Sequence, residues 1–290
     1  MSDNSVVLEK LHVVLLSIIK DIDKICKENG ITYYLAGGSA LGAIRHQGFI
    51  PWDDDLDILM DIENYEKFKR VCEEKLDTTK YYFEKGNTEE FPMLFSKIRL
   101  RNTTFLEGYE KYCRRGCLGI YIDIFLLHNT TKNKFYQFKQ FLYTRLLVAN
   151  SLTKIGYHTT SRLKKMVLNY ASKLSVKRKN KLLKYVTKYD HQKTELYCEF
   201  VGRGKKKNKI YKKNMFGEGK YVPFAGENLL VPAQIKNYVV QLFGEDCMEL
   251  PPENKRATLH VKYIDFNREL SYEQAIQQLE QLEEEKDRNE

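Results

Sequence analysis

The sequence predicts an α+β protein in which a small mixed β-sheet is flanked by helices and joined to a basic helical part. Two kinds of pattern support this prediction. Short apolar runs of strand length stand at residues 56–60 and 119–127, and apolar residues recur at helical spacing in residues 5–29 and 132–190. With 290 residues, of which 42% are hydrophobic, the chain can bury a sizeable core as one large domain or two small ones.

The first part of the chain alternates helices with strands. Gly30 predicts a helix end, because glycine accepts the left-handed backbone that often follows a helix. Asp61 predicts a helix start, because its carboxylate caps free backbone N–H groups. In order, we expect a helix at residues 5–29, a strand at 31–38 that ends in two glycines, a helical turn at 39–45, a buried strand at 56–60 and a helix at 61–76.

The remaining elements follow from the same periodicities. Gly86 and Asn87 predict a turn between two strands, and Pro232 leads from a hairpin into a helix. We expect strands at residues 81–84, 94–101 and 119–127, helices within 132–190, a loop at 201–213, a hairpin at 221–232, a helix at 233–244 and an acidic, solvated helix or frayed tail at 272–290.

Positive charge is concentrated in one part of the chain. Residues 132–213 hold 23 Lys or Arg against three acids, a net charge of +20. Since the whole chain has a net charge of +9, the rest of the chain carries −11. Such asymmetry predicts an anionic partner on one face. The helical stretch 134–152 adds aromatic and aliphatic residues, so it is expected either to lie on an anionic membrane or to pack on the core or a second copy.

The six cysteines follow no disulfide framework, and no signal peptide precedes them, so we expect reduced thiols and a cytoplasmic protein. Cys113 and Cys117 are spaced like two zinc ligands, but no second pair accompanies them. No apolar run approaches the length of about 18 residues that spans a bilayer.

The stretch from Tyr34 to Met60 carries most of the chemistry. Glycines at a strand–helix turn let backbone N–H groups approach a phosphate, and a helix N-terminus favours an anion. Asp53, Asp55 and Asp57 alternate along an extended segment, so their carboxylates share one face. Like charges so close require a cation between them, and oxygen ligands beside a phosphate indicate Mg²⁺.

Two later strands carry charged residues that need an explanation. Asp123 stands in an apolar run, and a buried carboxylate requires a partner, either a salt bridge or a role as the third carboxylate of the site. Lys97, Arg99 and Arg101 share one face of their strand. That face is either solvated or, at Lys97, in reach of a phosphate.

The run GGSALGAIRHQGFIPWDDDLDI resembles the signature of the LicD family of phosphocholine transferases and of the related fukutin-type enzymes. That family is similar to the wider nucleotidyltransferase superfamily, so the resemblance implies a nucleotidyltransferase-like fold. It is dense over residues 30–60, weaker at 94–104, 119–126 and 215–260, and thin at 130–200. We therefore expect a catalytic core at residues 1–130, a basic helical insertion or subdomain at 131–213, and a C-terminal part at 214–290 that completes the catalytic domain.

The resemblance also implies a reaction and a set of site residues. A CDP-activated donor such as CDP-choline is attacked at its distal phosphorus by a sugar hydroxyl of a teichoic-acid or lipopolysaccharide precursor, and CMP leaves. The cofactor would be Mg²⁺, with Mn²⁺ as the alternative. The expected catalytic residues are Asp55, Asp57 and Asp123; the metal ligands are Asp53, Asp55, Asp57 and Asp123; and the substrate-binding residues are Gly37, Gly38, Ser39, Arg45, Lys97 and His260.

Two other functions remain open at this point. One is a nucleotidyltransferase that acts on RNA or a small molecule, although no RNA-binding motif accompanies the basic helices and no nucleic-acid partner is expected. The other is a non-catalytic protein that binds glycan or membrane, which the intact carboxylates disfavour. The donor's head group is also open among choline, ribitol phosphate and glycerol phosphate. The expected location is the cytoplasm, with peripheral contact at the inner face of the membrane.

Overall fold

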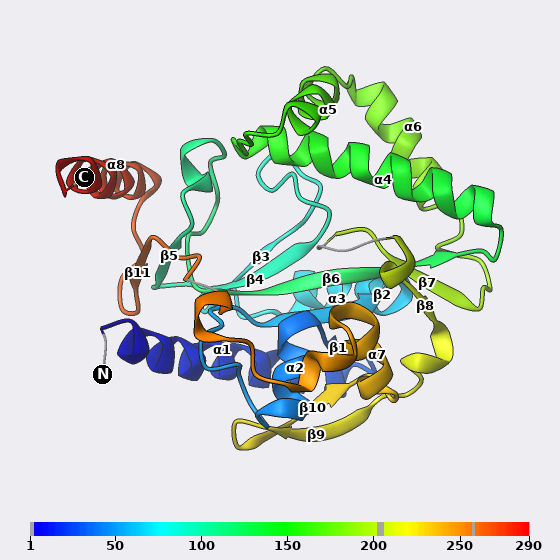
Figure 1. Cartoon of the computed structure of the whole chain (residues 1–290). Helices are drawn as coiled ribbons and strands as arrows, with labels where there is room; N and C mark the ends of the chain where they lie inside the picture. The colour runs from blue at the N-terminus through cyan, green and yellow to red at the C-terminus, as the bar shows by residue number, and fades with distance from the viewer. Residues whose placement is uncertain (1–2, 202–205, 257–258, 290) are drawn as a thin grey trace.

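The computed structural model describes residues 3–201, 206–256 and 259–289 (Figure 1). A seven-stranded mixed sheet lies at its centre, with the strand order β1-β2-β6-β4-β3 and with β7 and β8 continuing from β6. Only β2 and β6 pair in parallel within this sheet, and two further pairs, β9 with β10 and β5 with β11, form small antiparallel ribbons. The predicted α+β class is confirmed.

The strands are β1 (Tyr34–Leu35), β2 (Asp57–Asp61), β3 (Tyr81–Glu84), β4 (Ser96–Leu100), β5 (Thr104–Leu106), β6 (Tyr121–Thr130), β7 (Leu196–Glu199), β8 (Ile210–Lys212), β9 (Lys220–Phe224), β10 (Glu227–Val231) and β11 (Tyr263–Asp265). The α-helices of the described residues are α1 (Asp3–Glu28), α2 (Gly37–Arg45), α3 (Ile62–Lys75), α4 (Lys134–Lys154), α5 (Arg162–Ser172), α6 (Val176–Val186), α7 (Ile235–Phe243) and α8 (Tyr272–Asn289).

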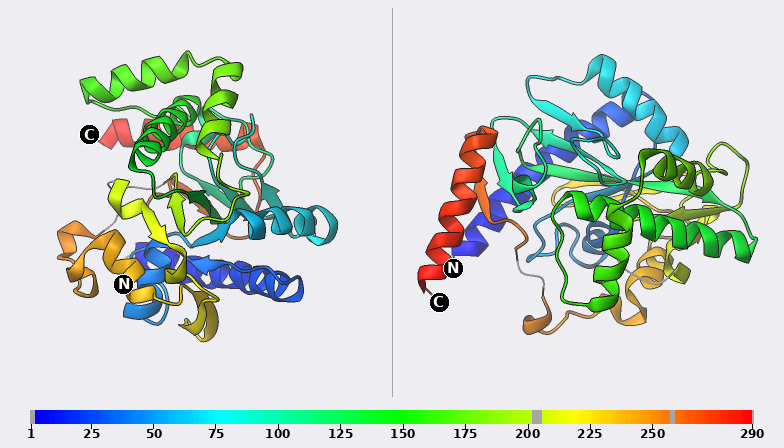
Figure 2. Two further views of the ribbon diagram at one scale, coloured as in Figure 1. Left: turned by 90° about the vertical axis from the view of Figure 1, so that its right-hand side faces the viewer. Right: turned by 90° about the horizontal axis from the view of Figure 1, so that it is seen from above.

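The helices form two layers about the sheet. Helices α1 and α3 contact β6 from one side, and Figure 1 shows α4, α5 and α6 on the other. The left view of Figure 2 shows the same separation from the side. None of the described helices is both long enough and apolar enough to cross a bilayer.

The predicted helix signals at the N-terminal part are confirmed. Helix α1 buries Leu11, Leu15 and Ile18 completely, and Gly30 follows its end with a φ of 61°. The carboxylate of Asp61 accepts a hydrogen bond from the backbone N–H of Asn64 and caps α3. The predicted strand at residues 31–38 is shorter than expected, because the chain turns into α2 at Gly37, which has a φ of 46°.

The basic part combines helices with strands. The expected helices are present as α4, α5 and α6, but β7 and β8 return from this part to the central sheet. The loop expected at residues 201–213 is therefore wrong at residues 210–212, and residues 202–205 lie outside the described chain. The boundaries of the three expected parts stay a prediction.

The C-terminal part contains the predicted hairpin, β9 with β10, followed by α7. The expectation of a wholly solvated terminal helix is wrong for α8. Its Ala275 and Leu279 are buried in a small apolar cluster with Leu106, Leu118 and Leu270. The acidic composition of α8 gives no sign of this buried face, because a helix can pack with apolar residues at only every third or fourth position.

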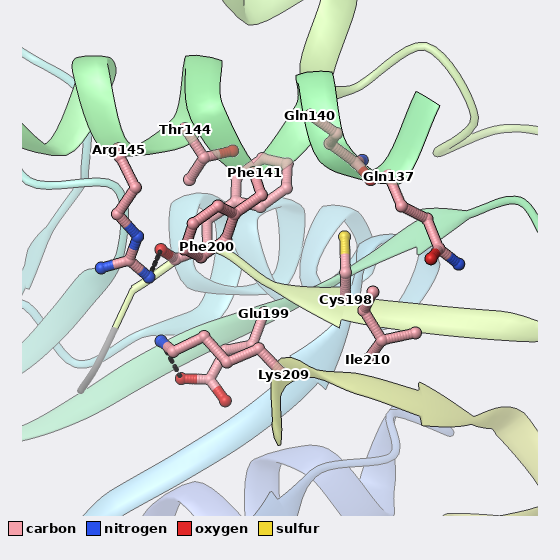
Figure 3. A pocket seen from close by; sticks show the side chains of 10 residues that line it. All are labelled: Gln137, Gln140, Phe141, Thr144, Arg145, Cys198, Glu199, Phe200, Lys209 and Ile210. Atoms are coloured by element: carbon pink, nitrogen blue, oxygen red, sulfur yellow. Dashed lines mark hydrogen bonds and ion pairs between the residues drawn. The ribbon is translucent and has the colours of Figure 1, made fainter. Parts of the chain in front are cut away.

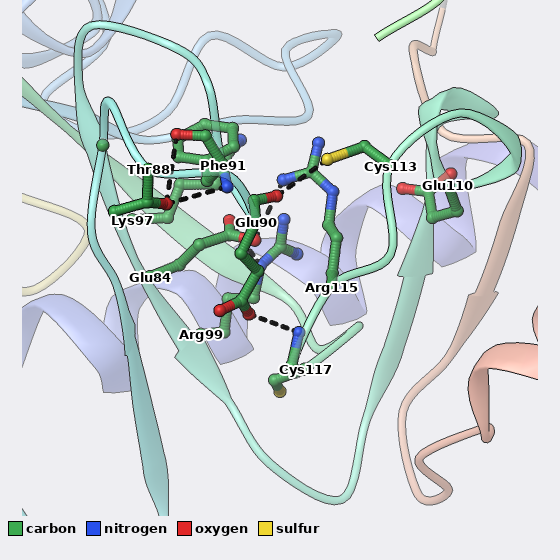
Figure 4. A network of polar contacts seen from close by, with 12 residues as sticks. Glu84, Thr88, Glu90, Phe91, Lys97, Arg99, Glu110, Cys113, Arg115 and Cys117 are labelled. Carbon is green, nitrogen blue, oxygen red and sulfur yellow. Dashed lines mark hydrogen bonds and ion pairs between the residues drawn. The ribbon is translucent and has the colours of Figure 1, made fainter. Parts of the chain in front are cut away.

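A buried charge network ties β3 to β4 and to the loop before β6 (Figure 4). The carboxylate of Glu84 lies 2.9 Å from Arg99 Nε and 2.9 Å from Arg115 Nη1, and all three side chains are at most 2% exposed. Burial alone would raise the pKa of Glu84, but the two guanidinium groups outweigh it and lower that pKa. The solvated face considered for Arg99 is therefore wrong.

We expect Glu84→Gln to destabilise the protein by about 3–5 kcal/mol, because the change leaves two buried guanidinium groups without their carboxylate. Urea unfolding of the variant and wild type measures this difference. The matched control is Glu195→Gln, which removes the exposed ion pair with Lys132 and is expected to cost at most about 1 kcal/mol. Equal losses in the two variants would contradict the structural role of the network.

Candidate active site

One row of charged residues crosses four strands of the sheet. In the register of the strands, Asp57 of β2 faces Asp123 of β6, Asp123 faces Lys97 of β4, and Lys97 faces Glu84 of β3. Residues directly opposite each other on paired strands point to the same face. The four side chains therefore form a single row, with a cation between carboxylates.

Lys97 is enclosed by rings and a carboxylate. Its Nζ lies 2.9 Å from Asp123 Oδ1 and 3.1 Å from the centre of the Tyr121 ring, and its side chain is 4% exposed. The rings of Phe95 and Phe91 lie 5.5 Å and 5.7 Å from the same ammonium. The solvated face considered for Lys97 is wrong, and the position is a cation site built from aromatic faces.

Both explanations considered for Asp123 meet at its position. The carboxylate forms the salt bridge with Lys97, and the register of β2 and β6 also places it beside Asp57. The structure thus brings together Asp57 and Asp123, which lie 66 residues apart in the chain. Their roles in catalysis stay predictions.

The two glycines at the start of α2 let carboxylates approach the backbone. A Cβ atom on Gly38 would lie 2.6 Å from Asp53 Oδ2, and one on Gly37 would lie 3.3 Å from Asp57 Oδ2. Gly38 therefore tolerates no side chain without displacing Asp53. The N-terminus of α2 faces the acidic cluster, in the place where the sequence predicts a phosphate.

Ser39 and Arg45 have structural contacts in addition to their predicted roles. Ser39 Oγ accepts a hydrogen bond of 2.9 Å from the backbone N–H of Asp57 and so fixes the start of β2 against α2. Arg45 Nη1 donates to the carbonyl oxygens of Cys247 and Glu249, at 3.0 Å and 3.1 Å. Arg45 therefore holds the segment after α7 against α2, and its contact with a donor phosphate stays a prediction.

His260 reaches the site through Asp54, a residue that the sequence reasoning did not select. Its Nδ1 lies 2.9 Å from Asp54 Oδ1, and its backbone N–H donates to Asp54 Oδ2 at 2.6 Å. The signal for this contact was the position of Asp54 between Asp53 and Asp55, which turns its side chain to the opposite face of an extended segment. The contact ties the C-terminal part of the chain to the acidic loop.

The electrostatic state of the site is set by crowding of carboxylates. Burial, followed by the charge of neighbouring aspartates, raises the pKa of Asp53 to about 6 and that of Asp55 to about 8. The same causes, in the same order, raise the pKa of Asp57 well above its usual value. Burial also raises the pKa of Asp123, although Lys97 opposes the shift. In the absence of a cation, these carboxyls therefore keep their protons at pH values where an ordinary aspartate is ionised.

The acidic cluster fits a divalent cation in its chemistry. Asp57 Oδ1 is buried without a hydrogen-bond partner, and such an orphaned oxygen is free to bind a metal. The ligands on offer are all carboxylate oxygens, which suit Mg²⁺. Across the residues that the structure describes, however, no three His, Cys, Asp or Glu side chains form a ready metal site. Asp123 is paired with Lys97, and Asp54 with His260.

A cavity of about 220 Å³ opens beside the row of charges. Its walls combine the acidic cluster with five aromatic rings and the half-buried carboxylate of Glu107. The lining residues are Asp54, Asp55, Phe91, Met93, Phe95, Lys97, Phe105, Glu107, Tyr109, Arg115, Tyr121, Asp123, Leu152, Ile155 and His260. The sequence reasoning missed the aromatic wall, because its members come from loops and strand ends without a common period.

A second hollow lies between α4 and the strands β7 and β8 (Figure 3). Its volume is about 20 Å³, which is room for about one water molecule. Glu199 and Lys209 form an ion pair of 3.9 Å at its floor. The cavity lined by Asp55, Lys97 and Asp123 is the candidate active site, because it adjoins the row of charges.

Comparison with known proteins identifies the class of domain. Residues 30–119, which contain the two-glycine turn, the acidic loop, Lys97 and the aromatic residues 91–109, match the family described as LicD/FKTN/FKRP, nucleotidyltransferase domain. The resemblance to the LicD family that the sequence predicts is thus confirmed for this segment.

Individual relatives differ in how much of the chain they cover. The lipopolysaccharide cholinephosphotransferase LicD of Haemophilus influenzae is 25% identical over 268 residues, which is 88% of this chain and 96% of the relative. An uncharacterized protein, RP689, of Rickettsia prowazekii is 31% identical over 139 residues, or 48% and 40% of the two chains. The ribitol 5-phosphate transferase FKRP of Homo sapiens is 49% identical over 43 residues, or 14% and 9%.

We expect the protein to lose stability as the pH rises from 6 to 8 in the absence of divalent cations. Asp55 is protonated in the folded state up to a pKa of about 8 but ionises near 4 when unfolded, so the folded state binds the extra proton in this range. This one carboxyl lowers the stability by up to about 1.4 kcal/mol per pH unit. Melting temperatures measured with a chelator present test the slope.

The variant Asp55→Asn should flatten this pH dependence and raise the melting temperature at pH 8. Glu280→Gln, which changes an exposed residue of α8, serves as the control and should keep the wild-type slope. An unchanged slope in Asp55→Asn would show that this carboxyl is ionised at neutral pH, and the assigned direction of its pKa would be wrong.

Proposed function

We propose that the protein transfers phosphocholine from CDP-choline to a sugar hydroxyl of a cell-surface glycan precursor, with release of CMP and with Mg²⁺ as cofactor. The glycan would be of the teichoic-acid or lipopolysaccharide type, and the reaction would take place at the cytoplasmic face of the membrane. The proposal includes a nucleotidyltransferase-like fold for the catalytic part. Support comes from the match to the LicD domain family and from relatives whose names describe transfer of cholinephosphate and ribitol 5-phosphate.

The observation that carries the proposal is the position of Asp57 and Asp123. Their registered strands bring them together, and Asp123 lines a cavity whose walls also include five aromatic rings. In-line displacement at phosphorus needs a charged end that receives the phosphates and a separate place for the group that moves. The acidic cluster with the N-terminus of α2 supplies the first, and the ring-lined part of the cavity supplies the second.

In the proposed reaction the acceptor hydroxyl oxygen forms a bond to the phosphorus that carries choline. The bond from that phosphorus to the bridging oxygen breaks, the electron pair stays on the oxygen, and CMP leaves. Asp123 accepts the hydroxyl proton, and its raised pKa suits a general base that operates near neutral pH. Once Asp123 is protonated, it no longer carries the negative charge that holds the Lys97 ammonium. Lys97 can then contact a phosphate oxygen.

Other residues bind and orient the donor. Backbone N–H groups at Gly37 and Gly38, with Ser39 and Arg45, would hold phosphate oxygens that do not react. Mg²⁺, or Mn²⁺ as the alternative, would be held by Asp55 and Asp57 together with Asp53 or Asp123, and it supplies the positive charge that neutralises the phosphates. His260 orders the acidic loop through Asp54.

We take choline rather than a polyol as the head group. The rings of Phe91, Phe95 and Tyr121 are engaged by the ammonium of Lys97, so the ring faces proposed for choline are those of Tyr109 and Phe105 in the same wall. A quaternary ammonium gains from ring faces and needs no hydrogen bonds. Ribitol and glycerol carry hydroxyl groups that an aromatic wall leaves unpaired, which is costly.

We expect Asp55→Asn, Asp57→Asn and Asp123→Asn each to abolish nearly all release of CMP from CDP-choline in the presence of Mg²⁺ and an acceptor, while the circular dichroism spectrum stays that of a folded protein. If Asp57→Asn kept more than about a tenth of the wild-type rate, a loss below about 1.4 kcal/mol, the assignment of this carboxylate would be wrong. Turnover of ATP without CMP release would instead favour a nucleotidyltransferase.

We expect Tyr109→Leu to raise the KM for CDP-choline by about 3- to 30-fold, because it removes one ring face from the choline site. The KM for CDP-glycerol or CDP-ribitol should change little. Tyr109 is half-buried at the cavity wall, so the fold should tolerate the change. A higher turnover with CDP-ribitol than with CDP-choline in the wild type would overturn the choice of head group and leave the transferase mechanism intact.

A further inference from the structure

Helix α5 exposes an apolar stripe to solvent. Leu163, Met166 and Tyr170 are 71%, 70% and 59% exposed, and Val167 lies between them on the same helical face. The spacing of three, four and seven residues from Leu163 is the pattern that normally faces a core. Among the described residues, nothing covers this stripe.

The stripe is not the face by which α5 is attached. Ala171 is buried against α4, Leu168 is half-buried, and Asn150 Nδ2 donates a hydrogen bond of 2.9 Å to the carbonyl oxygen of Ala171. These contacts fix α5 on the outer side of α4, away from the sheet (Figures 1 and 2). The exposed stripe is therefore surplus to the fold, and a contiguous apolar surface of this kind marks an interaction site.

The charge around the stripe has a single sign. Residues 161–189 contain ten Lys or Arg and no Asp or Glu. Lys164, Lys165, Lys173, Lys177 and Arg178 are all exposed. The surface is thus complementary to an anionic partner that also offers apolar material.

The membrane face expected at residues 134–152 stays a prediction. Tyr136 and Leu147 of α4 are buried, since they pack against β7 and α6, whereas Phe135, Phe138 and Leu142 of the same helix are 67%, 54% and 52% exposed. The structure adds to this expectation the apolar stripe of α5, the next helix along the chain.

We propose that α5 docks the protein on an anionic lipid surface, with Leu163, Met166 and Tyr170 in the interfacial region and the Lys and Arg side chains against the head groups. Each basic residue near such a surface contributes roughly 1 kcal/mol, and an apolar face adds binding that charge alone does not give. A soluble polyanion would use the charges but not the stripe. The apolar stripe therefore favours a lipid surface over a soluble polyanion as the partner.

The helix that carries this surface follows the wall of the candidate active site in the chain. Leu152 and Ile155 at the end of α4 line the cavity, and α5 begins at Arg162 after a short loop. If the proposed function holds, docking through α5 would bring the protein to a bilayer that carries the acceptor on a lipid. The docking itself does not depend on the identity of the donor or acceptor.

The first test is cosedimentation of the full chain with vesicles of equal parts phosphatidylcholine and phosphatidylglycerol, and with vesicles of phosphatidylcholine alone. We expect binding to the anionic vesicles only, and weaker binding when salt rises from about 50 to about 500 mM. The triple variant Leu163→Ser, Met166→Ser and Tyr170→Ser keeps every charge and should lose at least about tenfold in affinity. Val13→Ser, at an exposed apolar residue of α1, is the control and should bind as the wild type does.

The second test follows the stripe directly. Tyr170→Trp should show a blue shift of its emission and quenching by brominated lipid on anionic vesicles, whereas Val13→Trp should show neither. The proposal is overturned if the wild type ignores anionic vesicles at low salt. It is also overturned if the triple Ser variant binds them as well as the wild type, which would mean recognition of polyanions by charge alone.

Discussion

Lys97 and Asp123 form an ion pair of 2.9 Å inside the sheet, where little water screens their charges. This pair compensates one carboxylate in the middle of an acidic cluster. It also holds the ammonium of Lys97 against the Tyr121 ring and thereby fixes one wall of the cavity. Removal of either partner leaves the other as an isolated buried charge, which costs several kcal/mol of stability. The geometry of the site thus depends on an ion pair that no local sequence pattern predicts.

The acidic loop is also held in place by short-range contacts with other parts of the chain. Gly38 leaves room for Asp53, Ser39 accepts the N–H that begins β2, and His260 neutralises Asp54. Each of these contacts joins the loop to a different part of the chain. The loop is therefore held in place without hydrogen bonds to Asp57 Oδ1, which remains open to a cation or a ligand.

The sequence predicts several residues that the structure brings together at the candidate site, but not the aromatic walls of its cavity. The acidic run, the glycine turn and Asp123 could be found because strand and turn patterns repeat at short range, and a carboxylate inside an apolar run stands out. The ring wall formed by Phe91, Tyr109 and Tyr121 could not, because it is assembled from segments whose contact depends on tertiary packing. The return of β7 to the sheet was missed for the same reason, since pairing partners far apart in the chain leave no periodic trace.

The parallel pairing of β2 with β6 has a consequence for how this protein can change. Asp57 and Asp123 meet only while both strands keep their register, because a shift of one residue turns a side chain to the other face. The chain from Ile62 to Ile120, which connects the two strands, obeys the same constraint where β4 pairs with β6, because Lys97 must stay opposite Asp123. Changes in length are thus excluded within these three paired strands, so that the chemistry depends on the alignment of segments far apart in the chain.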